Sequence, residues 1–380
     1  MKSPVRSKNG WLSTMTELSP LAKDTLYFDA RYIRVDHHDG VSRFSAGLCD
    51  AIGKRIDTVA IVSDLRQLES LPKGIKHIQL SDPTSLIGEA FLGLKLNRIG
   101  AKLVFTPMQT MGRLGRRYKL LLTLHDLIYY AHPAAPPTFS PLIRLGWRIF
   151  HSFFWPQRVL LNSTDAVVTV SETTKALIAK HRLTRLPVHV VYNAAAHNDE
   201  QHEVAHSRPT DKQKLVYMGS FMDYKNVETL VVGMNMLPDY ELHLLSQITD
   251  TRRAELADLN RLGNVIFHNG VTDTEYLSHL DDAIALVTAS LDEGFGIPVI
   301  EAMGRGCPVV ISDIEIFREI GGDAATYFEA NSSEQFVEGV RKLESKTKWR
   351  QKSKESLEQA RKFNWEASAD ELIEAINTLY

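Results

Sequence analysis

The sequence predicts an α/β protein of two Rossmann-like domains, whose parallel sheets face one another across a cleft. A chain of 380 residues is too long for one ordinary hydrophobic core. Short apolar runs alternate with helical patterns along most of it, which is typical of stacked βαβ units. The alternation stops once, in residues 194–214, a polar and histidine-rich stretch without periodicity that we interpret as an interdomain linker.

The N-terminal domain is predicted to span residues 26–193, after a flexible leader of residues 1–25. The leader has basic residues but no continuous apolar core, so it does not resemble a signal peptide. Several of the expected strands are apolar almost throughout, as parallel strands covered on both faces are. These strands are expected at residues 25–33, 58–63, 76–80, 102–107, 120–126, 166–171 and 188–193.

The C-terminal domain is predicted to span residues 215–362, and a final helix is predicted at 363–380. Strands are expected at residues 215–220, 241–246, 265–271, 283–290 and 308–313. The final helix is amphipathic, which suits packing back on the N-terminal domain. Its apolar face consists of Leu372, Ile373, Ile376 and Leu379.

Composition excludes several functional classes. A net charge of -2 argues against a general nucleic-acid binder, which needs excess cation. The chain has two cysteines, Cys49 and Cys307, which are far apart in sequence. They therefore indicate neither a disulfide framework nor a zinc cluster. No apolar run is long enough to span a bilayer. These features predict a cytoplasmic protein.

The segment "SLDEGFGIPVIEAMGRGCPVVISD" (290–313) places Glu293 and Glu301 close to Gly294, Gly296 and Gly304, around a strand-to-helix loop. Pro298 suits the first position of a helix, and the glycines let backbone amides approach a phosphate. Glu301, one turn into that helix, can accept hydrogen bonds from vicinal hydroxyls, and Glu293 lies in the loop before it. A nucleotide sugar has both phosphates and diols. The alternative is a helix N-terminus with acids placed for its dipole.

A second loop, within residues 214–234, places Lys225 just before Asn226, a residue expected to cap the next helix. A cation at this position can neutralise a diphosphate leaving group, where the largest charge of glycosyl transfer develops. The alternative is a solvated lysine beside a helix cap.

These segments, "GSFMDYKN", "HNGVTDTEYLSHL" and "DEGFGIPVIEAMGRGCPVVISD", resemble the C-terminal half of the family 4 retaining glycosyltransferases, which have the GT-B fold. In the first half, "DHHDGVSRFSAGL" resembles the glycine loop of that family, "LTLHDLIYYAHP" its histidine-bearing strand end, and "VVTVSETTKALI…VHVVYNAA" its run into the linker. The resemblance spans roughly residues 26–378.

The resemblance implies a role for individual residues. The catalytic residues of the family are matched by three residues. Lys225 matches the lysine that binds the diphosphate. Glu293 matches the acid near the donor sugar, and His125 matches the histidine that faces this sugar. Glu301 matches the residue that binds the nucleotide ribose. The remaining donor-binding positions are Gly40 and Val41 near the phosphates, Gly270 and Val271 at the base, Phe295 and Gly296 with amides toward the sugar, and Ser220 and Ile297.

Two positions depart from the family pattern. An arginine is common where Ser220 stands, and another is common where Tyr224 stands before the lysine. Either the phosphates receive less cationic help here, or Arg43 or another residue supplies it.

Several other residues have ordinary explanations. His125 ends an apolar strand and could be a satisfied buried histidine. Ser171 is expected to cap a helix. Asp36 and Asp39, around two histidines, suggest a polar loop more than a metal site, and Cys307 is expected to be a small core residue.

The stretch 139–161 is expected to form a helix with basic and aromatic residues. Arg144 and Arg148 lie four apart, on one face. Such a helix can lie in a membrane interface. The alternative, which we favour, is a helix that packs on the sheet with its arginines at the rim.

Together these observations predict a metal-independent, retaining hexosyltransferase that moves a sugar from GDP-mannose or a UDP-sugar to a glycan, glycolipid or other acceptor, as in polysaccharide and cell-envelope biosynthesis. No Asp-x-Asp triplet occurs, so we expect no metal and no cofactor. A peripheral contact with the cytoplasmic membrane face is compatible with this function. The alternatives are an epimerase or a phosphorylase on the same fold, and a non-catalytic two-lobed binding protein. A dinucleotide oxidoreductase is disfavoured, because no G-x-G-x-x-G follows an early strand.

Overall fold

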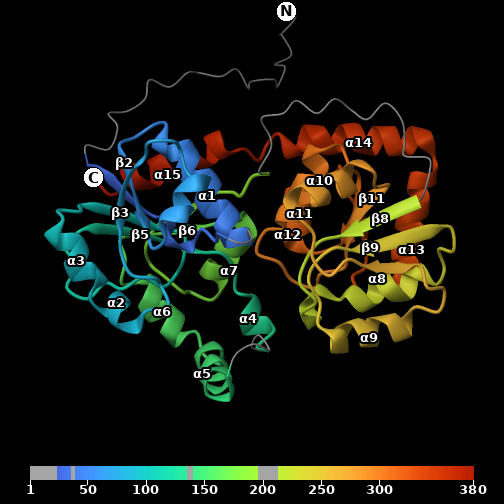
Figure 1. Ribbon diagram of the computed structural model, residues 1–380, viewed down its shortest axis with the longest axis horizontal. Helices are drawn as coiled ribbons and strands as arrows, with labels where there is room; N and C mark the ends of the chain where they lie inside the picture. The colour runs from blue at the N-terminus through green and yellow to red at the C-terminus, as the bar shows by residue number, and fades with distance from the viewer. Residues whose placement is uncertain (1–23, 36–38, 135–139, 196–212) are drawn as a thin grey trace, which may run out of the picture.

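The computed structural model describes residues 24–35, 39–134, 140–195 and 213–380, which form two α/β domains side by side (Figure 1). Each domain is a parallel sheet with helices on both faces, so the predicted fold class is confirmed. In Figure 1 the N-terminal domain runs from blue to green and the C-terminal domain from yellow to red.

The N-terminal sheet has the strand order β3-β2-β1-β4-β5-β6-β7, and all its strand pairs are parallel. Alternate side chains serve opposite faces: Phe28 and Val168 pack toward α1, whereas Val104 and Leu122 belong to clusters on the other face. The strands are β1 (Leu26–Asp29), β2 (Thr58–Val62), β3 (Lys76–Gln79), β4 (Leu103–Thr106), β5 (Lys119–Leu124), β6 (Ala166–Thr169) and β7 (Val188–Val190).

The helices of this domain follow the strands in the alternation that the sequence predicts. Ser171 accepts a hydrogen bond from the amide of Thr174 and so caps α7, as expected. The helices are α1 (Gly40–Gly53), α2 (Leu86–Ala90), α3 (Leu92–Arg98), α4 (Ile128–Ala131), α5 (Pro141–His151), α6 (Trp155–Leu161) and α7 (Glu172–Lys180), with short 3-10 helices η1 (Ala30–Tyr32) and η2 (Leu65–Ser70).

The C-terminal sheet has the order β10-β9-β8-β11-β12-β13, again entirely parallel. Its last strand, β13, was missing from the sequence prediction. β13 has three residues at the sheet edge, of which only Phe328 is buried, so it shows little of the apolar signal of the inner strands. The strands are β8 (Gln213–Tyr217), β9 (Tyr240–Leu244), β10 (Val265–Phe267), β11 (Ala285–Thr288), β12 (Val309–Ser312) and β13 (Thr326–Phe328).

Helices cover both faces of this sheet too. Val216 and Ile311 face one cluster with α10, α11 and α12, and Tyr217 and Val310 face the other with α8 and α13. The helices are α8 (Val227–Met234), α9 (Asp250–Leu259), α10 (Asp273–Asp281), α11 (Ile297–Gly304), α12 (Glu315–Gly321), α13 (Ser333–Arg341) and α14 (Lys346–Ala360), with η3 (Asp223–Lys225) and η4 (Lys342–Glu344).

The last helix, α15 (Trp365–Asn377), returns to the N-terminal domain and lies beside α1 (Figure 1). Gly47 of α1 leaves room for the indole of Trp365, because a Cβ at Gly47 would stand 2.2 Å from that ring. The hydroxyl of Ser368 donates to the carbonyl of Tyr192 at 2.7 Å. The C-terminal segment therefore joins the two domains a second time, in addition to the linker.

Polar contacts also hold the domains together beside the cleft. The hydroxyl of Ser171 donates to the carbonyl of Gly294 at 3.1 Å. Glu319 of α12 accepts hydrogen bonds from the amides of Glu172 and Thr173, at 2.7 and 2.8 Å. Glu319 thus supplies a negative charge at the N-terminus of α7, where the helix dipole favours one.

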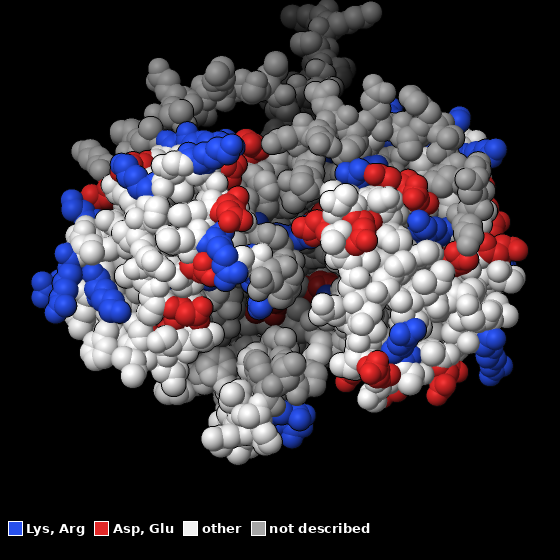
Figure 2. Space-filling model, in the orientation of Figure 1, with Lys and Arg blue, Asp and Glu red and all other residues white. Residues whose placement is uncertain are grey.

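The segment 139–161 corrects the sequence interpretation that we favoured. Residues 140–161 form two helices, α5 and α6, and α5 projects away from the body of the protein (Figure 1). Most of its side chains are exposed instead of packed on the sheet. Leu142 is 80% exposed and Trp155 is 68% exposed. In Figure 2 the projecting lobe is mostly uncharged, with one basic patch at its edge. Within the described residues, none of the helices has the length and hydropathy required to cross a bilayer.

Candidate active site

A cavity of about 590 Å³ lies between the two domains, at the carboxyl ends of their strands. Figure 2 shows the hollow between the two halves of the molecule. Most of the predicted site residues line this cavity: Gly40, Val41, His125, Ser220, Lys225, Glu293, Phe295, Gly296, Ile297 and Glu301. Gly270 and Val271 are not among the residues that line it.

The first turn of α11 presents its backbone to the cavity. Gly296 is the N-cap residue with φ of 100°, and a Cβ there would stand 2.8 Å from the ring of Phe317, so only glycine fits. The helix begins at Ile297, one residue earlier than predicted, which makes Pro298 its second residue. The ring of Phe295 is buried, so this residue can offer a ligand only its backbone. Unpaired amides at a helix start form an anion-binding site.

Lys225 and Glu293 form an ion pair within the cavity. The Nζ atom of Lys225 lies 2.5 Å from Oε1 of Glu293, and both side chains are largely buried. The hydroxyl of Ser290 donates to the same carboxylate oxygen at 2.8 Å. The amide of Leu291 donates to the carbonyl of Tyr224 at 2.7 Å, which fastens the two loops together. The lysine is therefore held in the cleft and is not a solvated surface residue.

Asn226 stands at the N-cap position of α8, as the sequence predicts, but its side chain does not cap the helix. Its backbone is left-handed, with φ of 49° and ψ of 42°, and its side chain makes no capping bond. The amide group of Asn226 instead donates to the carbonyl of Ala330 at 2.7 Å. This contact anchors the loop that carries Lys225 to the segment after β13.

Glu301 is 5% exposed and lies one turn into α11. Its carboxylate pairs with Nη1 of Arg43, which comes from α1 of the other domain. The second guanidinium nitrogen of Arg43 lies 2.7 Å from Oδ1 of Asp273, at the start of α10. Burial raises the pKa of Glu301, and the charge of Arg43 opposes that rise. Arg43, which was considered as a phosphate ligand, is thus engaged by two carboxylates.

His125 follows β5, and its Nε2 atom lies 2.7 Å from the carbonyl oxygen of Pro107. Because a carbonyl can only accept, Nε2 is the protonated nitrogen and Nδ1 is the acceptor. The edge-on ring of Phe44 lies 5.2 Å away, and burial lowers the pKa of His125. The histidine is therefore satisfied on one side and lines the cavity as well.

Asp126, the next residue, also lines the cavity and was missed by the sequence analysis. Burial raises the pKa of Asp126 to about 6, with further contributions from the charges of Asp292 and Glu293. Its Oδ1 atom accepts a hydrogen bond from the amide of Ile128 at 3.0 Å. The available signal was its position directly after an apolar strand, where parallel sheets bind ligands.

The loop after β10 contains the two predicted residues that do not line the cavity. Gly270 has φ of 105°, and its amide donates to the carbonyl of Leu245 at 2.9 Å. Val271 packs against the hydrophobic core.

Other sequence candidates have structural roles. Asp39 caps α1 through the amide of Ser42 and pairs with Arg34 at 2.6 Å, whereas Asp36 lies outside the described residues. Cys307 is buried as expected, and burial raises the pKa of its thiol to about 12.

A second cavity, of about 650 Å³, lies wholly within the N-terminal domain. It shares Val41, His125, Asp126 and Tyr129 with the interdomain cavity. It continues toward α5, and its walls there are mainly apolar and aromatic. These wall residues include Leu127, Tyr130, Ile143, Trp147 and Phe150.

Comparison with known proteins agrees with this architecture. A family model described as glycosyl transferases group 1 matches residues 198–363, and one described as glycosyltransferase family 4 matches residues 89–198. The sucrose-phosphate synthase of Thermosynechococcus elongatus superposes with a TM-score of 0.73 at 19% identity, covering 94% of this chain and 99% of that one. WaaG, a glycosyltransferase involved in lipopolysaccharide biosynthesis, superposes with a TM-score of 0.66 at 17% identity, covering 92% and 99%.

Among curated proteins, the O-antigen chain mannosyltransferase RfbU of Salmonella typhimurium (strain LT2) is 29% identical over 183 residues. That alignment covers 47% of this chain and 50% of the relative. The chain spans about half the length of the curated relatives that it matches. The two family models together reach from residue 89 to residue 363, across both domains of a GT-B fold. The chain therefore belongs to the family 4 glycosyltransferases.

Proposed function

We propose that this protein is a retaining glycosyltransferase that moves a hexose from a nucleotide-sugar donor to a glycan acceptor carried on a lipid. The observation that carries the proposal is the composition of the interdomain cavity. Lys225 paired with Glu293, the open N-terminus of α11 and the carboxylate of Glu301 all line it. The ammonium of Lys225 suits the charge of a diphosphate, and the amides at the N-terminus of α11 suit its oxygens. The carboxylate of Glu301 suits the diol of a ribose.

The donor would lie along α11. Its ribose hydroxyls would donate to Glu301, its diphosphate would meet the amides at Ile297 and the ammonium of Lys225, and its sugar would lie near Glu293 and His125. One relative is named as a mannosyltransferase, which supports mannose as the transferred sugar. We therefore propose GDP-mannose as the donor, ahead of a UDP-sugar.

The chemistry would depend on stabilising the leaving group. Negative charge grows on the diphosphate as the glycosidic bond breaks, and Lys225 and the start of α11 are placed to meet it. Glu293 is held by Lys225 and Ser290, which makes it a poor covalent nucleophile. We therefore assign retention to attack of the acceptor on the face that the phosphate leaves. The departing phosphate takes the proton, and no metal is required.

The acceptor would enter from the second cavity, which meets the first at His125 and Asp126. Its apolar wall and the adjoining α5 suit an acceptor with a lipid portion. The exposed side chains of α5 and the residues that follow it include Leu142, Ile143, Leu145, Ile149 and Phe153. Arg144 and Arg148 add positive charge on the same helix, so we propose a peripheral position on the cytoplasmic membrane face.

A donor panel tests the proposal. The purified chain is incubated with GDP-mannose, UDP-glucose or UDP-galactose, and a lipid-linked glycan extract, and release of nucleoside diphosphate is followed. Acceptor-dependent release with one donor, and a product whose anomeric configuration by NMR equals that of the donor, is the expected result. An inverted product would refute retention. Failure of every nucleotide sugar to bind or react would refute the function.

A further inference from the structure

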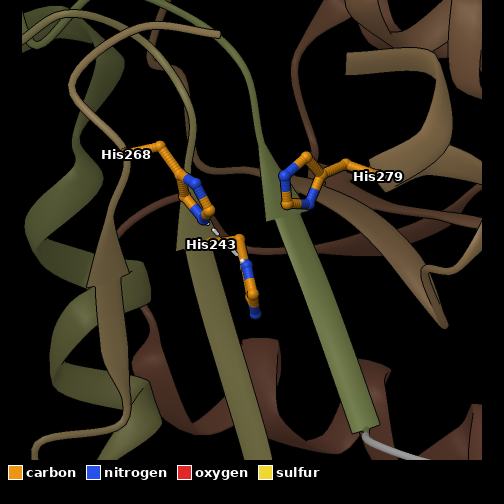
Figure 3. A group of neighbouring side chains, drawn as sticks. All are labelled: His243, His268 and His279. Carbon is orange, nitrogen blue, oxygen red and sulfur yellow. Dashed lines mark hydrogen bonds between the residues drawn. The ribbon is translucent and has the colours of Figure 1, made fainter. Parts of the chain in front are cut away.

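Three histidines gather on one face of the C-terminal sheet, away from the residues that line the interdomain cavity. His243 is the second-last residue of β9, His268 directly follows β10, and His279 lies in α10. Figure 3 shows the three rings turned toward one another, with a hydrogen bond between those of His243 and His268.

The ring nitrogens are close enough to share one ion. Nδ1 of His243 lies 3.0 Å from Nε2 of His268, and one nitrogen from each of the three rings lies within 4.8 Å of the others. Nitrogens around a tetrahedral zinc stand about 3.3 Å apart, given Zn–N bonds of about 2.0–2.1 Å. Small rotations of the side chains would therefore bring all three into bonding range.

The cluster also has a ring nitrogen available to a ligand. His243 is 8% exposed, and Nδ1 of His279 is buried without a hydrogen-bond partner among the described residues.

Charges of both signs act on the cluster. Lys214, on β8, is the cation, and at each ring its effect is larger than that of any single carboxylate. Lys214 lies 3.6 Å from Asp282, whose negative charge partly compensates it.

Glu241 occupies a supporting position. Its Oε2 atom lies 3.5 Å from Nε2 of His243. A metal bound at Nδ1 of His243 would leave the proton on Nε2, facing this carboxylate. Carboxylates commonly accept that second ring proton from a metal-bound histidine and thereby fix the tautomer.

We propose that His243, His268 and His279 form a binding site for one divalent transition-metal ion, and that zinc is the ion this donor set suits best. Three imidazole nitrogens favour zinc and its neighbours, whereas magnesium and calcium prefer oxygen ligands. The ion would tie α10 to β9 and to the end of β10. Since α10 begins at Asp273, the partner of Arg43, the site would stiffen one wall of the interdomain cavity without taking part in the chemistry.

The test measures zinc binding to the untagged full chain after chelator treatment, in the absence of donor and acceptor. Titration calorimetry with zinc chloride should give one ion per chain, and the melting temperature should rise with zinc because only the folded state holds the site. His268→Gln and His279→Gln should each weaken binding at least 100-fold. Glu241→Gln should weaken it about 10- to 100-fold, as loss of a supporting carboxylate does.

Two controls make the result specific. The linker stretch contains three more histidines, so binding is repeated with His197, His202 and His206 replaced by serine and should be unchanged. His77→Gln, at an exposed residue of β3, should also have no effect. Should a cluster variant fail to fold, cobalt(II) bound to the parent chain should give the intense visible absorption of a four-coordinate site.

Lack of zinc binding by the parent chain would overturn the proposal, as would binding that survives His268→Gln or disappears with the linker histidines. Octahedral cobalt absorption in the parent chain would also overturn it. None of these outcomes bears on the glycosyltransferase assignment, because the measurement uses no nucleotide sugar.

Discussion

Arg43 of the N-terminal domain holds Glu301 of the C-terminal domain in an ion pair across the interdomain cleft. Glu301 is the residue to which we assign the donor ribose, so a protein side chain occupies the carboxylate that the ligand would use. The pair is largely buried, since the side chain of Arg43 is 14% exposed and that of Glu301 is 5% exposed. Binding of the donor must then displace the guanidinium of Arg43 from Glu301, or supply hydrogen bonds to Glu301 in its place.

Removal of Arg43 should strengthen nucleotide binding. In Arg43→Ala the ribose hydroxyls no longer compete with a guanidinium for Glu301, and affinity for free nucleoside diphosphate should rise on the order of two- to tenfold. Titration calorimetry measures this directly. Arg34→Ala is the matched control, because Arg34 pairs with Asp39 inside the same domain. Weaker binding in Arg43→Ala would mean that Arg43 itself contacts the nucleotide, as the missing arginines near Ser220 and Tyr224 first suggested.

Glu301→Ala should act mainly on donor binding. Hydrogen bonds to a charged group are worth about 1.5–3 kcal/mol, so donor affinity should fall on the order of tenfold to a hundredfold or more. Free nucleoside diphosphate should weaken similarly, because it carries the same ribose. The Michaelis constant for the donor should rise more strongly than turnover falls. Circular dichroism and melting temperature verify that the variant is folded; full activity in a folded variant would refute the ribose assignment.

Lys225→Ala should act mainly on the chemical step. Lys225 meets charge that grows as the glycosidic bond breaks, so turnover at saturating donor should fall by more than binding does, on the order of a hundredfold. Steady-state kinetics with nucleotide binding measured separately distinguishes the two effects. Lys214→Ala is a comparable change on β8 outside the cleft. If Lys225→Ala raised only the Michaelis constant, Lys225 would be a binding residue and not a catalytic one.

The sequence predicts the fold well because most inner parallel strands are continuous apolar runs, and all twelve expected strand segments stand at strands of the structure. The omitted strand, β13, has only three residues, of which one, Phe328, is buried, so its signal is short and weak. Periodicity also shows that α5 is amphipathic, but it cannot show which face finds a partner. Only the packing reveals that Leu142 and Phe153 remain exposed.

Sequence patterns bring together candidate residues that stand within one loop, but not residues from distant segments. Glu293, Gly296 and Glu301 stand within one motif, so the sequence brings them together. The contact of Arg43 with Glu301 joins positions 258 residues apart, which no local pattern contains. His243, His268 and His279 likewise come from separate segments: strand β9, the residue after β10, and helix α10. The sequence analysis considered a zinc site only from the spacing of the two cysteines, so it did not consider these three histidines.

Transfer should not depend on magnesium or manganese, because Lys225 and the amides of α11 supply the positive potential at the diphosphate. Initial rates of chelator-treated enzyme should be equal with and without either ion. Zinc is kept constant in both arms, so occupancy of the histidine cluster does not vary. Activity lost in chelator and restored by magnesium or manganese would contradict this prediction.

Asp126 should make stability depend on pH. Burial raises its pKa to about 6 from an ordinary value of 3.8, so its ionised form is disfavoured in the folded state. The protonated carboxyl of Asp126 is compatible with the folded state, so the free energy of unfolding falls as pH rises from about 4 through 6 and this group ionises. Asp126→Asn removes that ionisation. The melting temperature of the variant relative to the parent should be higher at pH 7 than at pH 4.5, on the order of a few degrees. A difference that is independent of pH or reversed would show that Asp126 is not disfavoured by burial.

Helix α5 should bind anionic membranes. Each basic residue near such a surface contributes about 1 kcal/mol, so Arg144→Glu combined with Arg148→Glu should reduce co-sedimentation with phosphatidylglycerol vesicles about tenfold or more at low salt. The effect should shrink as salt rises, because screening weakens the attraction. Leu142→Gln should reduce binding at all salt concentrations, since it removes an apolar contact and no charge.

The matched control reverses two charges elsewhere, Lys342→Glu with Arg361→Glu, both exposed on the C-terminal domain. If α5 is the contact, this pair should sediment nearly as the parent does, because only charges close to the bilayer are felt within the screening length of about 10 Å at 0.1 M salt. Equal losses in both double variants would indicate non-specific attraction of the whole protein. Absence of vesicle binding by the parent would refute the membrane contact, and the apolar face of α5 would then need a protein partner.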